Sequence, residues 1–187
     1  MSEGARRTFV LVDGENIDAT LGNALLGRRP SPDERPRWER VTAFAAQVLD
    51  QQVTGLFFLN ASSGSLPQSF VQALLAMDYR PVPLAGTAEE KVVDIGIQRT
   101  LVALAGHDEA DVLLVSHDAD FVQQLAGLVD GHRRVGLVGF REFMSTQLTA
   151  LGLPLYDLED DVKAFTQPLP RVRIIPLADF DPERFLT

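Results

Sequence analysis

The chain has 187 residues, of which 45% are hydrophobic and 23% charged, a balance typical of a globular domain with one hydrophobic core. It has no cysteine, which excludes disulfides, thiolate metal sites and a cysteine nucleophile. No apolar run approaches the ~20 residues of a membrane-spanning helix, and residues 1–7 are too polar for a signal peptide, so we expect a cytoplasmic protein. The net charge of −9 argues mildly against a nucleic-acid coat protein, but not against an enzyme whose acidic centre binds divalent cations.

The first half of the chain alternates between strand-like and helix-like patterns. A continuous apolar run over 8–12 is typical of a strand buried on both faces, and it ends at Asp13-Gly14. The elements expected after it are a helix over 17–26, a proline-rich loop over 27–36, a helix over 38–49, a strand over 53–59, a helix over 67–77 and a proline-bearing edge strand over 80–84.

The second half continues this alternation. Thr87 and Glu90 have the spacing of a capping box, which predicts a helix from there to about residue 105. The elements expected after it are a strand over 111–116, a helix over 121–129, a strand over 134–140, a helix over 142–151 and a short strand over 153–156. We therefore predict one domain over 1–156 and an extension over 157–187 that packs on the domain or on a partner.

Strands that alternate with helices indicate an α/β fold with three α/β/α layers, a mostly parallel central sheet and right-handed crossovers, as in Rossmann-like proteins. In such sheets the ligand site lies beyond the carboxyl ends of the strands, where the strand order reverses.

Four aspartates fall where such a site is expected. Asp13 ends the first strand, Asp118 and Asp120 follow the fourth strand, and Asp94 lies in the helix after the third. If the first and fourth strands are neighbours, these carboxylates converge, and their mutual repulsion is relieved by a hard cation such as Mg²⁺ or Mn²⁺.

Each aspartate also has a simpler interpretation. Asp13-Gly14 is compatible with a plain turn, Asp118 with a helix N-cap, and Asp120 with the positive end of a helix. Asp94 lies three residues after Lys91, so the two could form a surface ion pair.

Three segments resemble the motifs of NYN domains, a branch of the PIN-like nucleases. Val12-Asp13-Gly14-Glu15-Asn16 resembles the first motif, Lys91-Val92-Val93-Asp94 the central lysine–aspartate motif, and Leu114-Val115-Ser116-His117-Asp118-Ala119-Asp120-Phe121 the third. The matches come in the family's order and are spread over residues 8 to about 140. Ala119 departs from the family's usual serine, which removes a hydrogen-bond donor but no metal ligand.

The resemblance implies a PIN-like fold and a divalent-metal ribonuclease. Asp13, Asp94, Asp118 and Asp120 would be the catalytic, metal-binding acids, and His117 is expected to face away from them. Asn16 would lie near the metal or the scissile phosphate, Ser116 would orient an acidic side chain, and Lys91 would contact phosphate. The chemistry is consistent with these residues, because a metal ion supplies both an activated water and charge stabilisation for phosphodiester hydrolysis.

An acidic nuclease also needs contacts that hold RNA. Fifteen of the seventeen basic residues are arginines, and several gather near Trp38, which could stack a base. The RNA-binding candidates are Arg28, Arg29, Arg35, Arg37 and Trp38. A solvated loop that Trp38 anchors to the core is the alternative.

Other functions on similar sheets are less compatible with the sequence. Position 15 is Glu15, so the paired aspartates of haloacid-dehalogenase phosphatases are absent after the first strand. The acid pattern of response-regulator receivers and the glycine-rich turn of dinucleotide-binding domains are also absent. A catalytically weak RNA-binding or scaffold module, with a C-terminal extension that serves a partner or a homodimer, remains the alternative to a nuclease.

Overall fold

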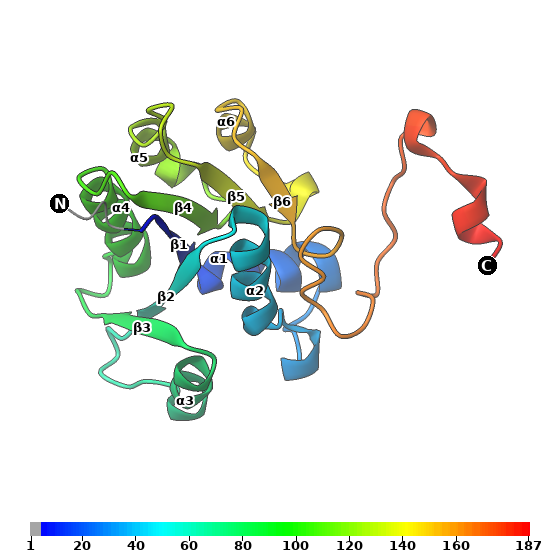
Figure 1. The fold of residues 1–187 in the computed structure, drawn as a ribbon. Helices are drawn as coiled ribbons and strands as arrows, with labels where there is room; N and C mark the ends of the chain where they lie inside the picture. The colour runs from blue at the N-terminus through cyan, green and yellow to red at the C-terminus, as the bar shows by residue number, and fades with distance from the viewer. Residues whose placement is uncertain (1–4) are drawn as a thin grey trace.

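Residues 5–187 are described by a computed structural model, and residues 1–4 of the expected domain lie outside this range. Six strands form one sheet in the order β3-β2-β1-β4-β5-β6, and every pair of neighbours is parallel (Figure 1). The strands are β1 (Arg7–Val12), β2 (Gln52–Asn60), β3 (Tyr79–Leu84), β4 (Ala110–Val115), β5 (Val135–Gly139) and β6 (Leu155–Asp157). The proline-bearing β3 lies at one edge, as the sequence predicts.

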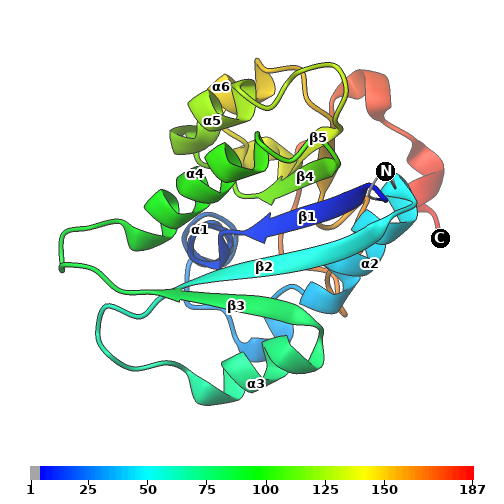
Figure 2. The same cartoon turned by 60° about the vertical axis from the view of Figure 1, so that its left-hand side comes forward.

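Helices cover both faces of the sheet (Figure 2). They are α1 (Gly14–Ala19), α2 (Trp38–Leu49), α3 (Gln68–Ala76), α4 (Val92–Leu104), α5 (Val122–Ala126) and α6 (Thr146–Thr149), and a π-helical segment, Thr20–Leu26, prolongs α1. The buried side chains of α1, α2 and α3 belong to one apolar cluster, and those of α4, α5 and α6 to a second. The predicted three-layer α/β/α fold is confirmed.

The centre of the sheet positions the candidate site. All six residues of β4 are buried, which agrees with its continuous apolar sequence. Val12 at the end of β1 is paired with Phe57 of β2 on one side and with Val115 of β4 on the other. The residues that follow β1 and β4 therefore emerge side by side, at the point where the strand order reverses.

Some predicted helix limits are wrong. The helix α4 begins at Val92, not near Thr87, because Glu90 closes a separate turn by accepting a hydrogen bond from the Thr87 N–H at 2.6 Å. The expected helices over 121–129 and 142–151 are shorter. Each is preceded by a 3₁₀ turn, Ala119–Phe121 before α5 and Arg141–Phe143 before α6. Further 3₁₀ turns span Pro32–Glu34, Leu177–Asp179 and Pro182–Phe185.

The chain after β6 first returns to the core and then leaves it. Leu158, Val162 and Leu169 are buried in the apolar cluster that contains α1 and α2. From Val172 onward the large apolar side chains are exposed, and the segment extends away from the sheet (Figure 1). The boundary at residue 156 stays a prediction. None of the helices within residues 5–187 combines the length and apolar character that crossing a lipid bilayer requires.

Candidate metal centre

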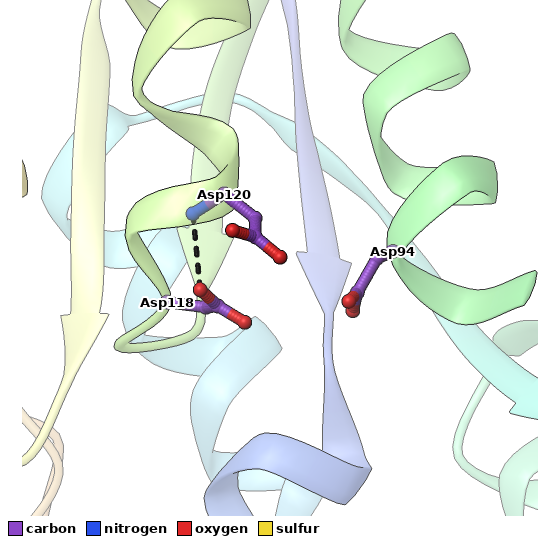
Figure 3. Close-up of side chains that lie close together, drawn as sticks. All are labelled: Asp94, Asp118 and Asp120. Carbon is purple, nitrogen blue, oxygen red and sulfur yellow. Dashed lines mark hydrogen bonds between the residues drawn. The ribbon is translucent and has the colours of Figure 1, made fainter. Parts of the chain in front are cut away.

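Three of the four expected acids meet at the carboxyl edge of the sheet. Asp94 comes from the first turn of α4, and Asp118 and Asp120 come from the turn after β4. Each offers one carboxylate oxygen, and these oxygens lie within 4.8 Å of one another (Figure 3). We call these three residues the acid cluster.

The turn after β4 sets the directions of two of the carboxylates. Asp118 is the N-cap of the 3₁₀ turn, and its Oδ1 accepts a hydrogen bond from the Asp120 N–H at 3.0 Å. The capping interpretation of Asp118 is therefore also correct. Its second oxygen stays available, and the carboxylates of Asp118 and Asp120 face Asp94 across a short gap (Figure 3).

Lys91 already places one positive charge beside the acid cluster. Its ammonium lies 3.8 Å from Asp94 and 3.6 Å from Asp120, so the expected ion pair with Asp94 is present. Burial, followed by the charge of Asp118, raises the pKa of Asp94, although Lys91 acts in the opposite direction. One ammonium against three carboxylates leaves the cluster with an excess of negative charge.

Asp13 is not part of this group of three, and its role as a fourth metal ligand stays a prediction. Its carboxylate is only 2% exposed, and Ser116 Oγ donates to its Oδ2 at 2.9 Å, the kind of contact expected of Ser116. Its Oδ1 accepts from the Asn16 N–H at 3.3 Å and so caps α1. Burial raises the pKa of Asp13 to about 6 despite these bonds, and the charges of Asp94 and Asp118 add to the rise. Asp13 thus lies next to the acid cluster, whose negative charges disfavour its ionised form.

Asn16 faces a histidine that the sequence analysis leaves out of the site. Its Oδ1 accepts from the His117 N–H at 2.9 Å and lies 2.8 Å from His117 Nδ1. His117 Nε2 accepts from the Phe140 N–H, so Nδ1 carries the ring proton and donates to Asn16. The Asn16 oxygen is thus bound within the protein, and the expected place of Asn16 near a metal or a phosphate stays a prediction. Burial lowers the pKa of His117 to about 4, so the ring is neutral at pH 7 and links the turn after β4 to α1 and β5.

A model of the NYN domain matches residues 7–151 of this chain. The chain belongs to the NYN domain family. NYN is a PIN-like nuclease domain, so the resemblance of the three motifs is confirmed at the level of the family.

The fold of this NYN chain is also found among solved structures. A crystal structure of a protein of unknown function from Vibrio parahaemolyticus matches it with a TM-score of 0.68 and 20% identity, over 86% of this chain and 98% of that chain. At this identity the likeness shows the fold alone. No curated protein matches this NYN chain.

The acid cluster of this NYN domain is consistent with a divalent metal site. Carboxylate oxygens are the hard donors that Mg²⁺ and Mn²⁺ prefer, and three of them converge from two elements. The negative charge of the cluster also attracts cations, because the ammonium of Lys91 already lies beside Asp94 and Asp120.

The expected RNA-binding residues of the NYN domain lie in three kinds of surroundings. Arg28 is paired with Glu34 at 2.5 Å and Arg35 with Asp18 at 2.7 Å, so their charges are already compensated. Trp38 is 7% exposed and forms a T-shaped pair with Phe57, so most of its side chain is part of the core, and its stacking on a base stays a prediction. Within residues 5–187, Arg29 and Arg37 make no ion pair.

Glu15 is a neighbour of the site that the sequence analysis does not select. It lies in the first turn of α1, two residues after Asp13, and its pKa is raised by burial and by the charge of Asp94. Its place in the first motif, directly after Asp13-Gly14, is the sequence feature that could have identified it.

Proposed function

We propose that this NYN domain is a metal-dependent ribonuclease that hydrolyses phosphodiester bonds of RNA, with Asp94, Asp118 and Asp120 as the ligands of Mg²⁺ or Mn²⁺. The observation that carries the proposal is the convergence of these three carboxylates at the carboxyl edge of the parallel sheet. A bound divalent ion would supply an activated water and neutralise the charge that develops on the phosphate.

The chain's own residues would accept the proton of the attacking water and hold the phosphates of the RNA. One carboxylate of the acid cluster accepts the proton of the attacking water. Lys91, which is 73% exposed beside the cluster, turns from Asp94 and Asp120 to a phosphate oxygen when RNA is present. Asp13 adds negative charge from its position next to the acid cluster, and the hydrogen bond from Ser116 fixes the direction of its carboxylate. Arg29 and Arg37 hold the phosphates of the bound strand.

The test is cleavage of a labelled single-stranded RNA by the purified chain with Mn²⁺ or Mg²⁺. We expect cleavage that stops when a chelator is added. Asp118→Asn should lower the rate about a hundredfold or more, because a metal ligand supports several kcal/mol of transition-state stabilisation. Asparagine is also a good N-cap, so this variant should keep the fold.

The matched control is Asp108→Asn, which removes a fully exposed carboxylate before the amino end of β4, at the sheet edge opposite the acid cluster. It should cut RNA as fast as the parent, and the loss of activity in Asp118→Asn purified in the same way would show that the activity does not come from a contaminating nuclease. If Asp118→Asn is as active as Asp108→Asn, the roles assigned to the acid cluster are wrong.

A second candidate function is an RNA-binding or scaffold module that cuts slowly or not at all. The feature that favours it is the C-terminal segment, where Val172, Ile174 and Leu177 are almost fully exposed and could bind a partner or a second copy of this chain. A parent protein that binds Mn²⁺ and RNA but leaves the RNA intact would establish this function in place of the nuclease.

A further inference from the structure

Residues 174–187, which we call the C-terminal arm, carry apolar side chains that the domain does not cover. Ile174, Leu177 and Leu186 are 99%, 87% and 74% exposed. Within residues 5–187, every hydrogen bond and ion pair of the arm is internal to it, and none of its side chains belongs to either apolar cluster. Exposed apolar side chains that gather in this way mark a site of protein–protein contact.

The arm has a compact aromatic end that also carries negative charge. Two 3₁₀ turns, Leu177–Asp179 and Pro182–Phe185, fold the arm back so that the ring centroids of Phe180 and Phe185 lie 5.8 Å apart. Three acids against one arginine give the arm a net side-chain charge of −2, and these residues are Asp179, Asp181, Glu183 and Arg184. The arm is thus a ligand with an aromatic body and a few carboxylates.

A groove of about 710 Å³ lies on the domain, between α3 and the loop that precedes α2. The helix α3 contributes an apolar wall of Phe70, Ala73 and Met77, which are spaced three and four residues apart and so lie on one helix face. Two largely buried aromatic side chains, Phe57 and Trp38, also line the groove. Its volume lies within the range of roughly 300–1,000 Å³ of pockets that enclose a drug-sized ligand, so it is large enough for two aromatic side chains.

The charges of the groove suit an apolar ligand with a few carboxylates. The loop before α2 contributes three guanidinium groups, those of Arg29, Arg35 and Arg37. Three acids also line the groove and balance them, namely Glu15, Asp18 and Glu39, so the groove is not a site for a polyanion. Asp18 is paired with Arg35 at 2.7 Å. Arg29 and Arg37 form no ion pair with any part of the chain that the structure describes, so they are free to pair with carboxylates of a ligand.

The arm is directed away from the groove of its own chain. Arg173 binds Asp157 at the end of β6, which is one edge strand of the sheet, whereas the groove lies beside α3 near the other edge. Beyond Arg173 the arm extends outward, and it lies apart from α3 in both views (Figure 1 and Figure 2). The groove of a second copy is therefore the surface to which the arm is presented.

We propose that two copies of this chain form a dimer in which the C-terminal arm of each copy fills the groove of the other. The aromatic end of the arm packs against Phe70 and Met77, and its acids pair with Arg29 and Arg37. The exchange is reciprocal, so the dimer is closed and contains the same contact twice. The dimer does not depend on the proposed nuclease, but a docked arm covers two arginines that the proposed function assigns to RNA.

The first test is the mass of the full chain in solution, measured by sedimentation over a range of concentrations. We expect a concentration-dependent dimer. Ala73 and Ala76 are both exposed on α3, but only Ala73 lines the groove. Ala73→Glu places a bulky anion inside the groove and should weaken each of the two contacts by about tenfold, which raises the dimer dissociation constant about a hundredfold. Ala76→Glu adds the same charge outside the groove and should stay within about twofold of the parent.

Mixing two variants distinguishes exchange between copies from docking within one copy. A chain with Phe180→Ser and Phe185→Ser keeps its groove but has a polar arm, whereas Ala73→Glu keeps its arm. Each variant alone should be monomeric at concentrations at which the parent is a dimer. Their mixture should contain a heterodimer, because the arm of one variant fits the groove of the other.

Trp38, the single tryptophan of the sequence, lines the groove and reports its occupancy. A peptide of residues 174–187 should change the Trp38 fluorescence of the Phe180→Ser, Phe185→Ser chain, whose groove is empty, and a scrambled peptide should not. A parent that stays monomeric, or equal dissociation constants of the two glutamate variants, would overturn the proposal. A mixture that stays monomeric although the peptide binds would mean that the arm docks within its own copy, and the dimer would be wrong.

Discussion

At the scale of single residues, the ionised carboxylate of Asp94 is destabilised within the acid cluster when no cation is bound. Its pKa is raised by burial and by Asp118, so its charged form is held against repulsion that Lys91 only partly offsets. A cation that binds the native cluster and not the unfolded chain should therefore stabilise the fold.

We predict that Mn²⁺ at about a hundred times its dissociation constant stabilises the parent by about 2.7 kcal/mol, which raises the melting temperature by about 5–10 °C. Asp94→Asn should abolish this rise, because it removes one of three ligands. Thermal unfolding with and without Mn²⁺ measures the effect. Asp108→Asn should respond like the parent, and an equal response of both variants would exclude Asp94 as a ligand.

Asp111 gives the fold a pH dependence far from the acid cluster. It is fully buried at the amino end of β4, where it binds Arg6, Arg134 and Gln51. Burial alone would raise its pKa, but these hydrogen bonds and charges outweigh burial and lower the pKa below its ordinary value of 3.8. The native state thus prefers the ionised form, and this stabilisation is complete above pH 3.8 and is lost as the pH falls through the native pKa.

We predict that Asp111→Asn lowers the free energy of unfolding at pH 7 by about 1–3 kcal/mol, because a buried neutral amide replaces the charged acceptor of the part-exposed Arg6 and Arg134 side chains. The difference between parent and variant should shrink below pH 3.8, where the parent also becomes protonated. Urea unfolding of both proteins at pH 7 and pH 3 measures it. A difference that is the same at both pH values would mean that the charge of Asp111 does not stabilise the fold.

The residue scale also shows where prediction from the sequence stops. The edge at which Asp13, Asp118 and Asp120 lie follows from their places after buried parallel strands. The inward position of Asp13 does not follow from its place in the sequence. It depends on hydrogen bonds from Ser116 and from the amide of Asn16, contacts that form only when β1 and β4 are paired. The isolation of Trp38 from solvent likewise depends on Phe57 in another element.

At the scale of elements, regular periodicity predicts structure better than local motifs do. The helix α2 has the predicted limits of 38 and 49, because its apolar positions face the sheet and define both ends. The start of α4 is missed, because the Thr87 and Glu90 pattern is satisfied within a turn of its own. A short motif records which local hydrogen bonds can form, but not whether a helix continues from them.

Close contact between β2 and β3 depends on the absence of a side chain at Gly55. A Cβ at this position would lie 2.6 Å from the ring of Tyr79, its partner in the ladder. That ring cannot move aside easily, because Tyr79 is buried and its hydroxyl donates to the Trp38 carbonyl at 2.9 Å. The pair therefore fixes β3 against β2 and α2.

We predict that Gly55→Ala lowers the free energy of unfolding by about 1–3 kcal/mol through overpacking. Gly106→Ala is the control, since a Cβ there meets only the Ala103 carbonyl at 3.4 Å and should change stability by less than about 0.5 kcal/mol. Urea unfolding of the two variants gives the comparison. If both variants match the parent, the contact between Gly55 and Tyr79 does not limit the packing of β3.

At the scale of the whole molecule, the chain after β6 has two parts with different relations to the domain. The first part adds Leu158, Val162 and Leu169 to the core between the sheet and α2. At the start of the second part, Arg171 and Arg173 bind an acidic group that comprises Glu142 together with Asp157, Glu159 and Asp160 at the end of β6 and in the first part. Beyond these arginines the apolar side chains are exposed.

This arrangement predicts a graded response to truncation. A chain that ends at Ile175 keeps both arginines and should melt within a few degrees of the parent. A chain that ends at Pro170 leaves the acidic group without its arginines, so it should be less stable, and the loss should be smaller at high salt, where repulsion is screened. A chain that ends at Tyr156 loses four buried apolar side chains, those of Leu158, Val162, Ala164 and Leu169. The two leucines are worth about 2–5 kcal/mol each, a large share of the 5–15 kcal/mol of a typical domain.

The shortest chain should therefore lack a cooperative thermal transition, and calorimetry of the three truncated chains measures the gradient. If the chain that ends at Tyr156 melts like the parent, residues 1–156 are a self-sufficient domain and residues 157–187 are a true extension. If it fails to fold while the chain that ends at Pro170 folds, the domain extends to about residue 170. In that case the free C-terminal segment consists of Arg171 and the residues after it.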